Sequence, residues 1–74
     1  MRTRNFTAII EREDGAYVSL CPELGIASQG NTVDQAKENL REAIELFLDT
    51  ASPDEVARRL HDDVYITRLE VAFG

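Results

Sequence analysis

The strongest constraint on the fold is the segment NTVDQAKENLREAIELFL, residues 31–48. Thr32 and Gln35 form a T-x-x-Q capping box, which satisfies free backbone donors at the start of a helix. Apolar side chains then recur at three- and four-residue spacing, while charged residues occupy most of the opposite side. The apolar stripe consists of Val33, Ala36, Leu40, Ala43, Ile44, Phe47 and Leu48. The pattern predicts a helix that is buried along one side and lies on a sheet.

Strand-like segments precede this helix. Asn5–Arg12 and Tyr17–Cys21 are rich in residues that favour β-structure. The Asp14-Gly15 pair between them suits the positive φ angles of a tight hairpin turn. Ile26–Gly30 is short and predicts a third strand. The first thirty residues are therefore expected to form an antiparallel sheet of three strands.

The segment CPELGIASQGNT, residues 21–32, lies between the second strand and the helix. Pro22 cannot donate a ladder hydrogen bond, so it should end the strand before it. We expect Leu24 to pack inward, and Gly25 and Gly30 to allow turns before the helix begins. The segment is interpreted as a structural turn and a short strand, and not as a reaction centre.

The last third of the chain predicts a short helix and a strand. Ser52 is a good N-cap, Pro53 suits the first helical position and Glu55 completes a second capping box. The β-rich end of the chain contains Val64, Ile66, Leu69, Val71 and Phe73. The predicted fold is α+β, in one domain over residues 1–74, with the order β-β-β-α-(short α)-β. Its mixed four-stranded sheet is covered on one face by the long helix.

The size of the chain predicts that it associates with another subunit. A domain of 74 residues buries roughly 60–65% of its unfolded surface, so it usually needs a disulfide, a metal or a partner. With one cysteine no internal disulfide can form, and Cys21 and His61 are not grouped as zinc ligands. We therefore expect a homodimer or a higher oligomer, with the five apolar residues of the final strand as its interface.

The alternation of apolar residues also bears on this expectation. Ile9 and Ile10 are adjacent, and the final strand changes its apolar parity between Ile66 and Leu69. A β-bulge near Thr67 or Arg68 would return both halves of that strand to one face of the sheet. Burial of the second face or of the edge by another subunit is the alternative, and we favour it.

No group of residues in the sequence indicates catalysis. Glu11 and Glu70 are the only carboxylates within predicted strands, and neither belongs to an acid-rich motif of the kind that holds Mg²⁺. His61 is expected at a helix end, where it would complement the dipole, and Cys21 has no evident base beside it. We therefore predict no enzyme activity, no catalytic residues, no cofactor and no metal.

The charge of the chain favours a basic protein as partner. Eight basic and fourteen acidic residues give a formal net charge of −6, which disfavours binding to nucleic acid phosphates. Such a surface would attract a basic protein, although acidity can also serve only to keep a small protein soluble. Residues 1–12 lack the apolar run of a signal peptide, and no segment is long enough to cross a membrane. The chain is expected to be cytoplasmic.

The run YVSLCPELGIASQGNTVDQAKENLREAIELFL, residues 17–48, preceded by AIIEREDGA, resembles the N-terminal domain of HicB-type antitoxins and their stand-alone HicB-like relatives. The resemblance implies a fold similar to a truncated RNase H core. It also implies binding to a small, basic, mRNA-cleaving HicA-type toxin whose active site is blocked. Many members of the family carry a C-terminal DNA-binding domain. This chain ends at Gly74 after a short helix and a strand, so operator binding does not carry over.

Three hypotheses follow. The first is a non-catalytic, antitoxin-like module that binds a HicA-type toxin through Glu13, Asp14, Glu23 and Glu38. The second is an orphan homo-oligomeric HicB-like protein without a toxin. The third, a degenerate RNase H-like nuclease, is disfavoured because the first strand presents Phe6, Ala8 and Ile10 where carboxylates would be needed.

Overall fold

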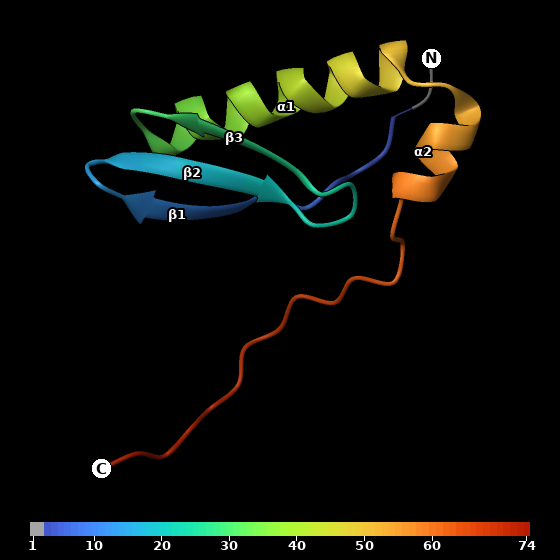
Figure 1. Ribbon diagram of the computed structural model, residues 1–74. Helices are drawn as coiled ribbons and strands as arrows, with labels where there is room; N and C mark the ends of the chain where they lie inside the picture. Colours follow the sequence, from blue (N-terminus) through green and yellow to red (C-terminus); the bar gives the residue numbers. More distant parts are fainter. Residues whose placement is uncertain (1–2) are drawn as a thin grey trace.

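The computed structural model describes residues 3–74, and Figure 1 shows a small sheet beneath a long helix. The strands are β1 (Ile9–Glu13), β2 (Ala16–Cys21) and β3 (Ile26–Gly30), antiparallel and in the order β1-β2-β3. The long helix is α1 (Val33–Thr50), and the short helix is α2 (Pro53–Arg59). The α+β class, the three antiparallel strands and both helices are confirmed.

Local signals account for the turns and the helix start. Asp14 and Gly15 have φ angles of 49° and 79°, as the tight hairpin between β1 and β2 requires. The Thr32 hydroxyl accepts a hydrogen bond from the Gln35 backbone N–H at 3.0 Å, and the Gln35 side chain accepts one from the Asn31 N–H at 2.6 Å. β1 begins later than predicted, because residues 3–8 run beside α1 without joining the strand.

The core lies between α1 and one face of the sheet. Its buried apolar residues are Cys21, Leu24, Ala36, Leu40 and Ile44. The buried Ser19 hydroxyl on β2 donates to the backbone carbonyl of Ala36 at 2.9 Å, so the one polar side chain in this layer is satisfied. A Cβ atom on Gly30 would lie 2.5 Å from the Ala36 nitrogen, so glycine is required where β3 meets the helix. The sheet and α1 are therefore in close backbone contact.

The turn between β2 and β3 organises one end of the molecule. β2 ends at Cys21, directly before Pro22, and Leu24 is buried while Gly25 has a φ of 67°. The guanidinium of Arg59 donates to the Leu24 carbonyl at 2.9 Å, which ties α2 to this turn. The prediction that this segment is a structural turn and short strand is confirmed.

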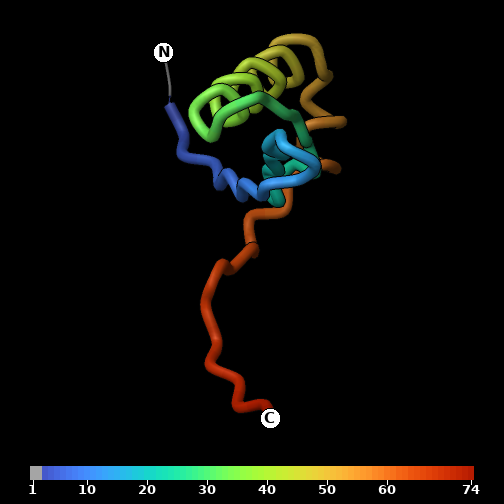
Figure 2. Tube along the Cα trace, turned by 90° about the vertical axis from the view of Figure 1, so that its left-hand side faces the viewer, coloured from blue at the N-terminus to red at the C-terminus, as the bar shows by residue number. Residues whose placement is uncertain are grey.

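The predicted fourth strand is not part of the sheet. Residues 61–74, which we call the C-terminal tail, are extended and project away from the rest of the chain (Figures 1 and 2). The described residues span 49 × 29 × 19 Å with a radius of gyration of 14.4 Å, whereas a compact chain of this length would have about 11 Å. The chain turns outward at His61, whose backbone N–H donates to the Glu23 carbonyl at 2.7 Å. Among residues 3–74 the tail pairs with no strand, so the sheet is antiparallel throughout and not mixed as predicted, and the question of a bulge near Thr67 or Arg68 does not arise.

Candidate functional site

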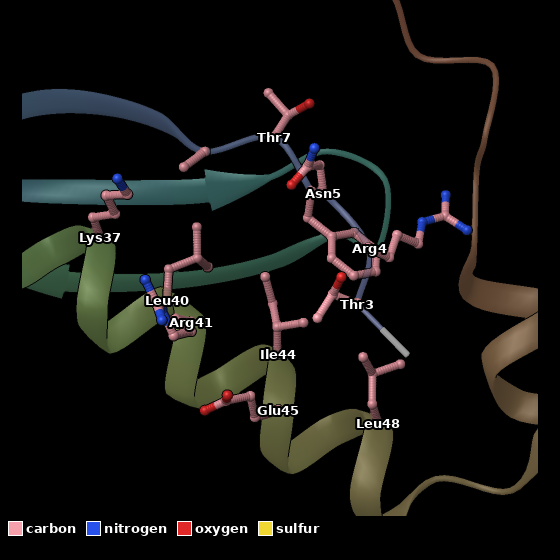
Figure 3. A pocket seen from close by; sticks show the side chains of 12 residues that line it. Thr3, Arg4, Asn5, Thr7, Lys37, Leu40, Arg41, Ile44, Glu45 and Leu48 are labelled. Carbon is pink, nitrogen blue, oxygen red and sulfur yellow. The ribbon is translucent and has the colours of Figure 1, made fainter. Parts of the chain in front are cut away.

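A groove runs between α1 and the N-terminal segment, residues 3–8 (Figure 3). Its volume is about 730 Å³. Leu40, Ile44 and Leu48 line it from α1, and Phe6 and Ala8 line it from the opposite wall. Charged and polar side chains complete the lining: Thr3, Arg4, Asn5, Thr7, Lys37, Arg41 and Glu45.

The groove is open because the sheet stops at β1. Within residues 3–74 no strand pairs with the outer edge of β1, so nothing covers the adjoining side of α1. Leu48 keeps 41% of its surface exposed there. An apolar lining with charged neighbours beside a free strand edge suits an extended peptide segment.

The tail carries the second unusual surface. Tyr65, Leu69 and Phe73 are 84%, 81% and 97% exposed, and Ile66 and Val71 are also exposed. Of the five residues predicted to form an oligomer interface, Val64 alone is partly buried. All five are spread along the extended tail between residues 64 and 73, and none of them belongs to a strand. A row of large apolar side chains in water is unfavourable by roughly 25 cal/mol per Å² and indicates an interaction surface.

The four acidic residues predicted to contact a partner are not gathered in one place. Glu13 and Asp14 lie at the hairpin between β1 and β2, and Glu38 lies on the exposed side of α1. Glu23 lies in the β2–β3 turn, at the other end of the hairpin sheet. The structure therefore separates Glu23 from the other three.

The carboxylate of Glu23 is engaged within the chain. It accepts hydrogen bonds from the Thr7 backbone N–H at 3.1 Å and from the Thr7 hydroxyl at 2.5 Å, and the Cys21 thiol lies 3.4 Å away. Burial on its own would raise the pKa of Glu23, but the Thr7 and backbone hydrogen bonds outweigh it and hold that pKa below its ordinary value. Glu23 thus fastens the N-terminal segment, one wall of the groove, to the β2–β3 turn.

The sequence pattern placed charged residues on the polar side of α1, but it was not used to single out an acidic ridge along the helix. Its members are the exposed residues Asp34, Glu38, Glu42, Glu45 and Asp49. Their spacings of four, four, three and four residues place them on one stripe of the helix. Of these five, Glu38 alone has an ion-pair partner among residues 3–74, namely Arg41 at 3.1 Å. The helical period that identified the apolar stripe could also have identified the ridge, had it been applied to the carboxylates.

The residues considered for catalysis are dispersed. Cys21 is buried, and burial raises the pKa of its thiol. Glu11 and Glu70 lie on β1 and on the exposed tail, and His61 is exposed at the start of the tail. Among residues 3–74 no three His, Cys, Asp or Glu side chains are grouped so that they could hold a metal ion. No helix in that range is sufficiently long and apolar to cross a membrane.

Comparison with known proteins assigns the chain to a family. It is 37% identical over 68 residues to a UPF0150 protein of Helicobacter pylori (strain J99), covering 90% of this chain and 94% of that protein. It is 36% identical over 69 residues to a UPF0150 protein of Thermotoga maritima, covering 89% and 88% of the two chains. A UPF0150 protein of Synechocystis is 46% identical over 48 residues, covering 62% of this chain and 61% of the relative.

Those names state no activity, ligand or partner. No family model and no solved structure matches the chain. Two of the relatives match over nearly their whole length at more than 30% identity. The chain therefore belongs to the UPF0150 family.

Proposed function

We propose that this protein is a non-catalytic protein-binding module, an antitoxin-like inhibitor of a small, basic, mRNA-cleaving protein of the HicA type. The proposal rests on the resemblance of residues 17–48 to HicB-type antitoxins and on the acidic ridge of α1. The ridge is the observation that carries it, because it supplies a surface of suitable charge on a rigid element.

Repulsion between neighbouring carboxylates of the ridge opposes the stability of the helix that bears them. Carboxylates three or four residues apart on a helix repel each other by about 0.2–0.5 kcal/mol per pair. The five residues make four such neighbouring pairs, and Asp49 stands in the last helical turn, where negative charge also opposes the helix dipole. A cationic partner surface would relieve all of these repulsions at once. The arrangement therefore favours a function in which the ridge faces Lys and Arg side chains.

Inhibition in this proposal is steric and electrostatic. The ridge would attract the basic toxin, speed its encounter and fix its orientation, and the bound module would cover the surface that RNA must reach. Glu13 and Asp14 remain exposed and available to the same partner. Glu23 is not included, since its carboxylate is bound to Thr7.

The test is inhibition and binding of a candidate small basic RNA-cleaving protein from the same genome. Glu38→Lys/Glu42→Lys reverses two charges on the ridge, and Glu11→Lys/Asp63→Lys reverses two charges away from it. Each double variant changes the formal net charge from −6 to −2, because each replacement of a carboxylate by lysine raises the net charge by two. We expect the ridge variant to bind at least about tenfold more weakly at low salt and to lose inhibition, and the control to retain most of both.

Two outcomes would contradict the proposal. One is failure of every small basic RNA-cleaving protein of that genome to bind at low salt, where attraction between opposite charges is greatest. The other is equal weakening by both double variants, since this would show that only net charge matters. Incubation of the chain alone with RNA and Mg²⁺ serves as a further control. RNA cleavage that disappears in Glu11→Gln or Glu70→Gln would instead indicate a nuclease.

A further inference from the structure

We propose that the C-terminal tail of each chain forms the fourth strand on a second copy of the protein. In this arrangement the tail lies along the free outer edge of β1 and the N-terminal segment, and one side of it fills the groove beside α1. The exchange is reciprocal and yields a two-fold symmetric dimer. It goes beyond the proposed inhibition of a basic partner and does not depend on it.

The tail has the residue pattern of a strand that is buried on one side. Alternate side chains of an extended segment point to opposite sides, so residues 65, 67, 69, 71 and 73 share one side. That side carries Tyr65, Thr67, Leu69, Val71 and Phe73, and it contains no charge. The other side combines the charged Arg68 and Glu70 with the apolar Val64, Ile66 and Ala72, so it is the less uniform of the two. The large apolar residues of the first side are all exposed in the single chain.

The groove suits this segment, which is long enough to span it. Five of the residues that line the groove are apolar, and the adjacent edge of β1 has backbone groups free to pair with an added strand. Residues 65–73 extend over about 30 Å at roughly 3.3 Å per residue. The part of α1 that lines the groove, from Lys37 to Leu48, extends over about 18 Å at 1.5 Å per residue. The tail is therefore long enough to span the whole groove.

The way the tail leaves its own chain favours a second copy as the recipient. The exit is fixed by the hydrogen bond from the His61 N–H to the Glu23 carbonyl and by the ion pair between Arg4 and Asp62. From this point the tail runs outward (Figures 1 and 2). It contributes no residue to the lining of its own groove. A second chain offers the same groove and lacks the same strand, so one exchange satisfies both molecules. The added apolar burial supplies what a 74-residue domain lacks on its own.

Light scattering coupled to size-exclusion chromatography tests the exchange with two matched pairs of variants. Leu69→Asp places a charge on the apolar side of the tail, and Arg68→Asp places the same side chain on the other side. Leu48→Asp places a charge in the groove, whereas Leu46, 65% exposed on the same helix, does not line it, so Leu46→Asp is its control. Far-UV circular dichroism of each variant verifies that the helices are retained.

We expect the wild type, Arg68→Asp and Leu46→Asp to have twice the chain mass of 8.3 kDa at micromolar concentration. Leu69→Asp and Leu48→Asp should each raise the dimer dissociation constant at least about tenfold, because each buries an unpaired charge in the interface. A monomeric wild type at this concentration would overturn the proposal.

Loss of the dimer in Leu69→Asp but not in Leu48→Asp would also overturn it, since the tail would then bind another surface. The uncovered face of the sheet, with Ile9, Val18, Leu20 and Ala27, is the alternative surface. The ridge double variant Glu38→Lys/Glu42→Lys should remain dimeric. A failure of strand exchange is therefore distinguishable from a failure of partner inhibition.

Discussion

The body of the molecule, residues 3–60, and the C-terminal tail, residues 61–74, use similar residues with opposite results. Seven of the fourteen tail residues are apolar, compared with 43% of the whole chain. In the body the core residues are packed between α1 and the sheet, with Leu24 and Leu40 almost completely buried. In the tail they are exposed, and Phe73 keeps 97% of its surface in solvent. Apolar content alone therefore does not decide which residues form the core of this chain.

The two regions differ in where their partners come from. Each strand of the body pairs with its neighbour in sequence, and α1 follows β3 directly, so every partner is supplied by a short connection. The tail must find a strand edge. Within residues 3–74 the outer edges of β1 and β3 are both unpaired, and the edge beside the groove belongs to β1, at the other end of the chain. Contacts of large sequence separation cost more chain entropy to close, and a second molecule can supply the same edge. The body is a folding unit, whereas the tail is an interaction element.

The largest expected effect comes from making the same substitution in both regions. Leu40→Ala should destabilise the fold by about 2–5 kcal/mol, because it leaves a cavity in the core between α1 and the sheet. Leu69→Ala should have little effect on the free energy of unfolding in dilute solution, where tails are unpaired, and a growing effect as concentration rises. Urea unfolding of both variants at two protein concentrations, tenfold or more apart, measures the contrast. A concentration-independent loss in Leu69→Ala would mean that the tail packs on its own chain.

Much of the body could be predicted from the sequence because its signals are local. The Thr32 cap, the Asp14-Gly15 turn and the break at Pro22 each act within a few residues, and each is where it was expected. The fourth strand was predicted from an equally clear pattern, but a strand exists only with an edge to pair with. The sequence of a segment shows that it prefers the extended form, but it does not identify the molecule whose strand edge the segment pairs with.

The candidate site was only partly predictable for a related reason. Glu38 and the apolar residues of the tail were recognised, while the groove was not, because it arises from the absence of a strand beside β1. Glu23 was chosen for its charge, and its hydrogen bonds to Thr7 connect residues sixteen apart. Such a contact follows from the tertiary arrangement of the β2–β3 turn and has no signature in the sequence around Glu23.

The second prediction concerns the close contact between β3 and α1 in the body. Gly30→Ala would place a Cβ atom 2.5 Å from the Ala36 nitrogen and 2.8 Å from the Gln35 carbonyl carbon. Both are backbone atoms, so the helix must move away from the sheet, at a cost of about 1–3 kcal/mol. Gly74→Ala at the end of the tail, where nothing lies within 4 Å, is the control and should leave stability unchanged. Thermal unfolding of the two variants would test this, and equal midpoints would show that the backbones are not in tight contact.

The third prediction concerns the junction between body and tail, where Glu23 binds Thr7 through its side chain and His61 through its carbonyl. Glu23→Gln should cost about 1–2 kcal/mol at neutral pH, since it replaces charge-assisted hydrogen bonds with neutral ones. The control Glu13→Gln, at the exposed end of β1, should change stability by less than about 0.5 kcal/mol. Urea unfolding at pH 7 measures both.

The pH dependence of that effect has a definite sign. The pKa of Glu23 is lower in the folded chain than its ordinary value of 4.5, so its ionised form stabilises the fold above the unfolded-state pKa. This contribution is lost as the pH falls through the lower, folded-state pKa. The difference between wild type and Glu23→Gln should therefore be largest at neutral pH and shrink in acid below about pH 4. A difference that stays constant from pH 7 to pH 3 would mean that the Glu23 charge does not stabilise this junction.

The smallest expected effect concerns the acidic ridge, which differs from the rest of the body because its carboxylates repel one another in the free chain. Glu42→Gln removes like-charge repulsion with Glu38 and Glu45 and should stabilise the protein by about 0.5 kcal/mol at low salt. Glu38→Gln also removes two repulsions, but it loses the ion pair with Arg41, so its gain should be smaller. Because these charges are exposed, both gains should disappear near 1 M salt. Urea unfolding in low and high salt measures the difference, and destabilisation by Glu42→Gln at low salt would mean that the ridge helps the fold and needs no partner to explain it.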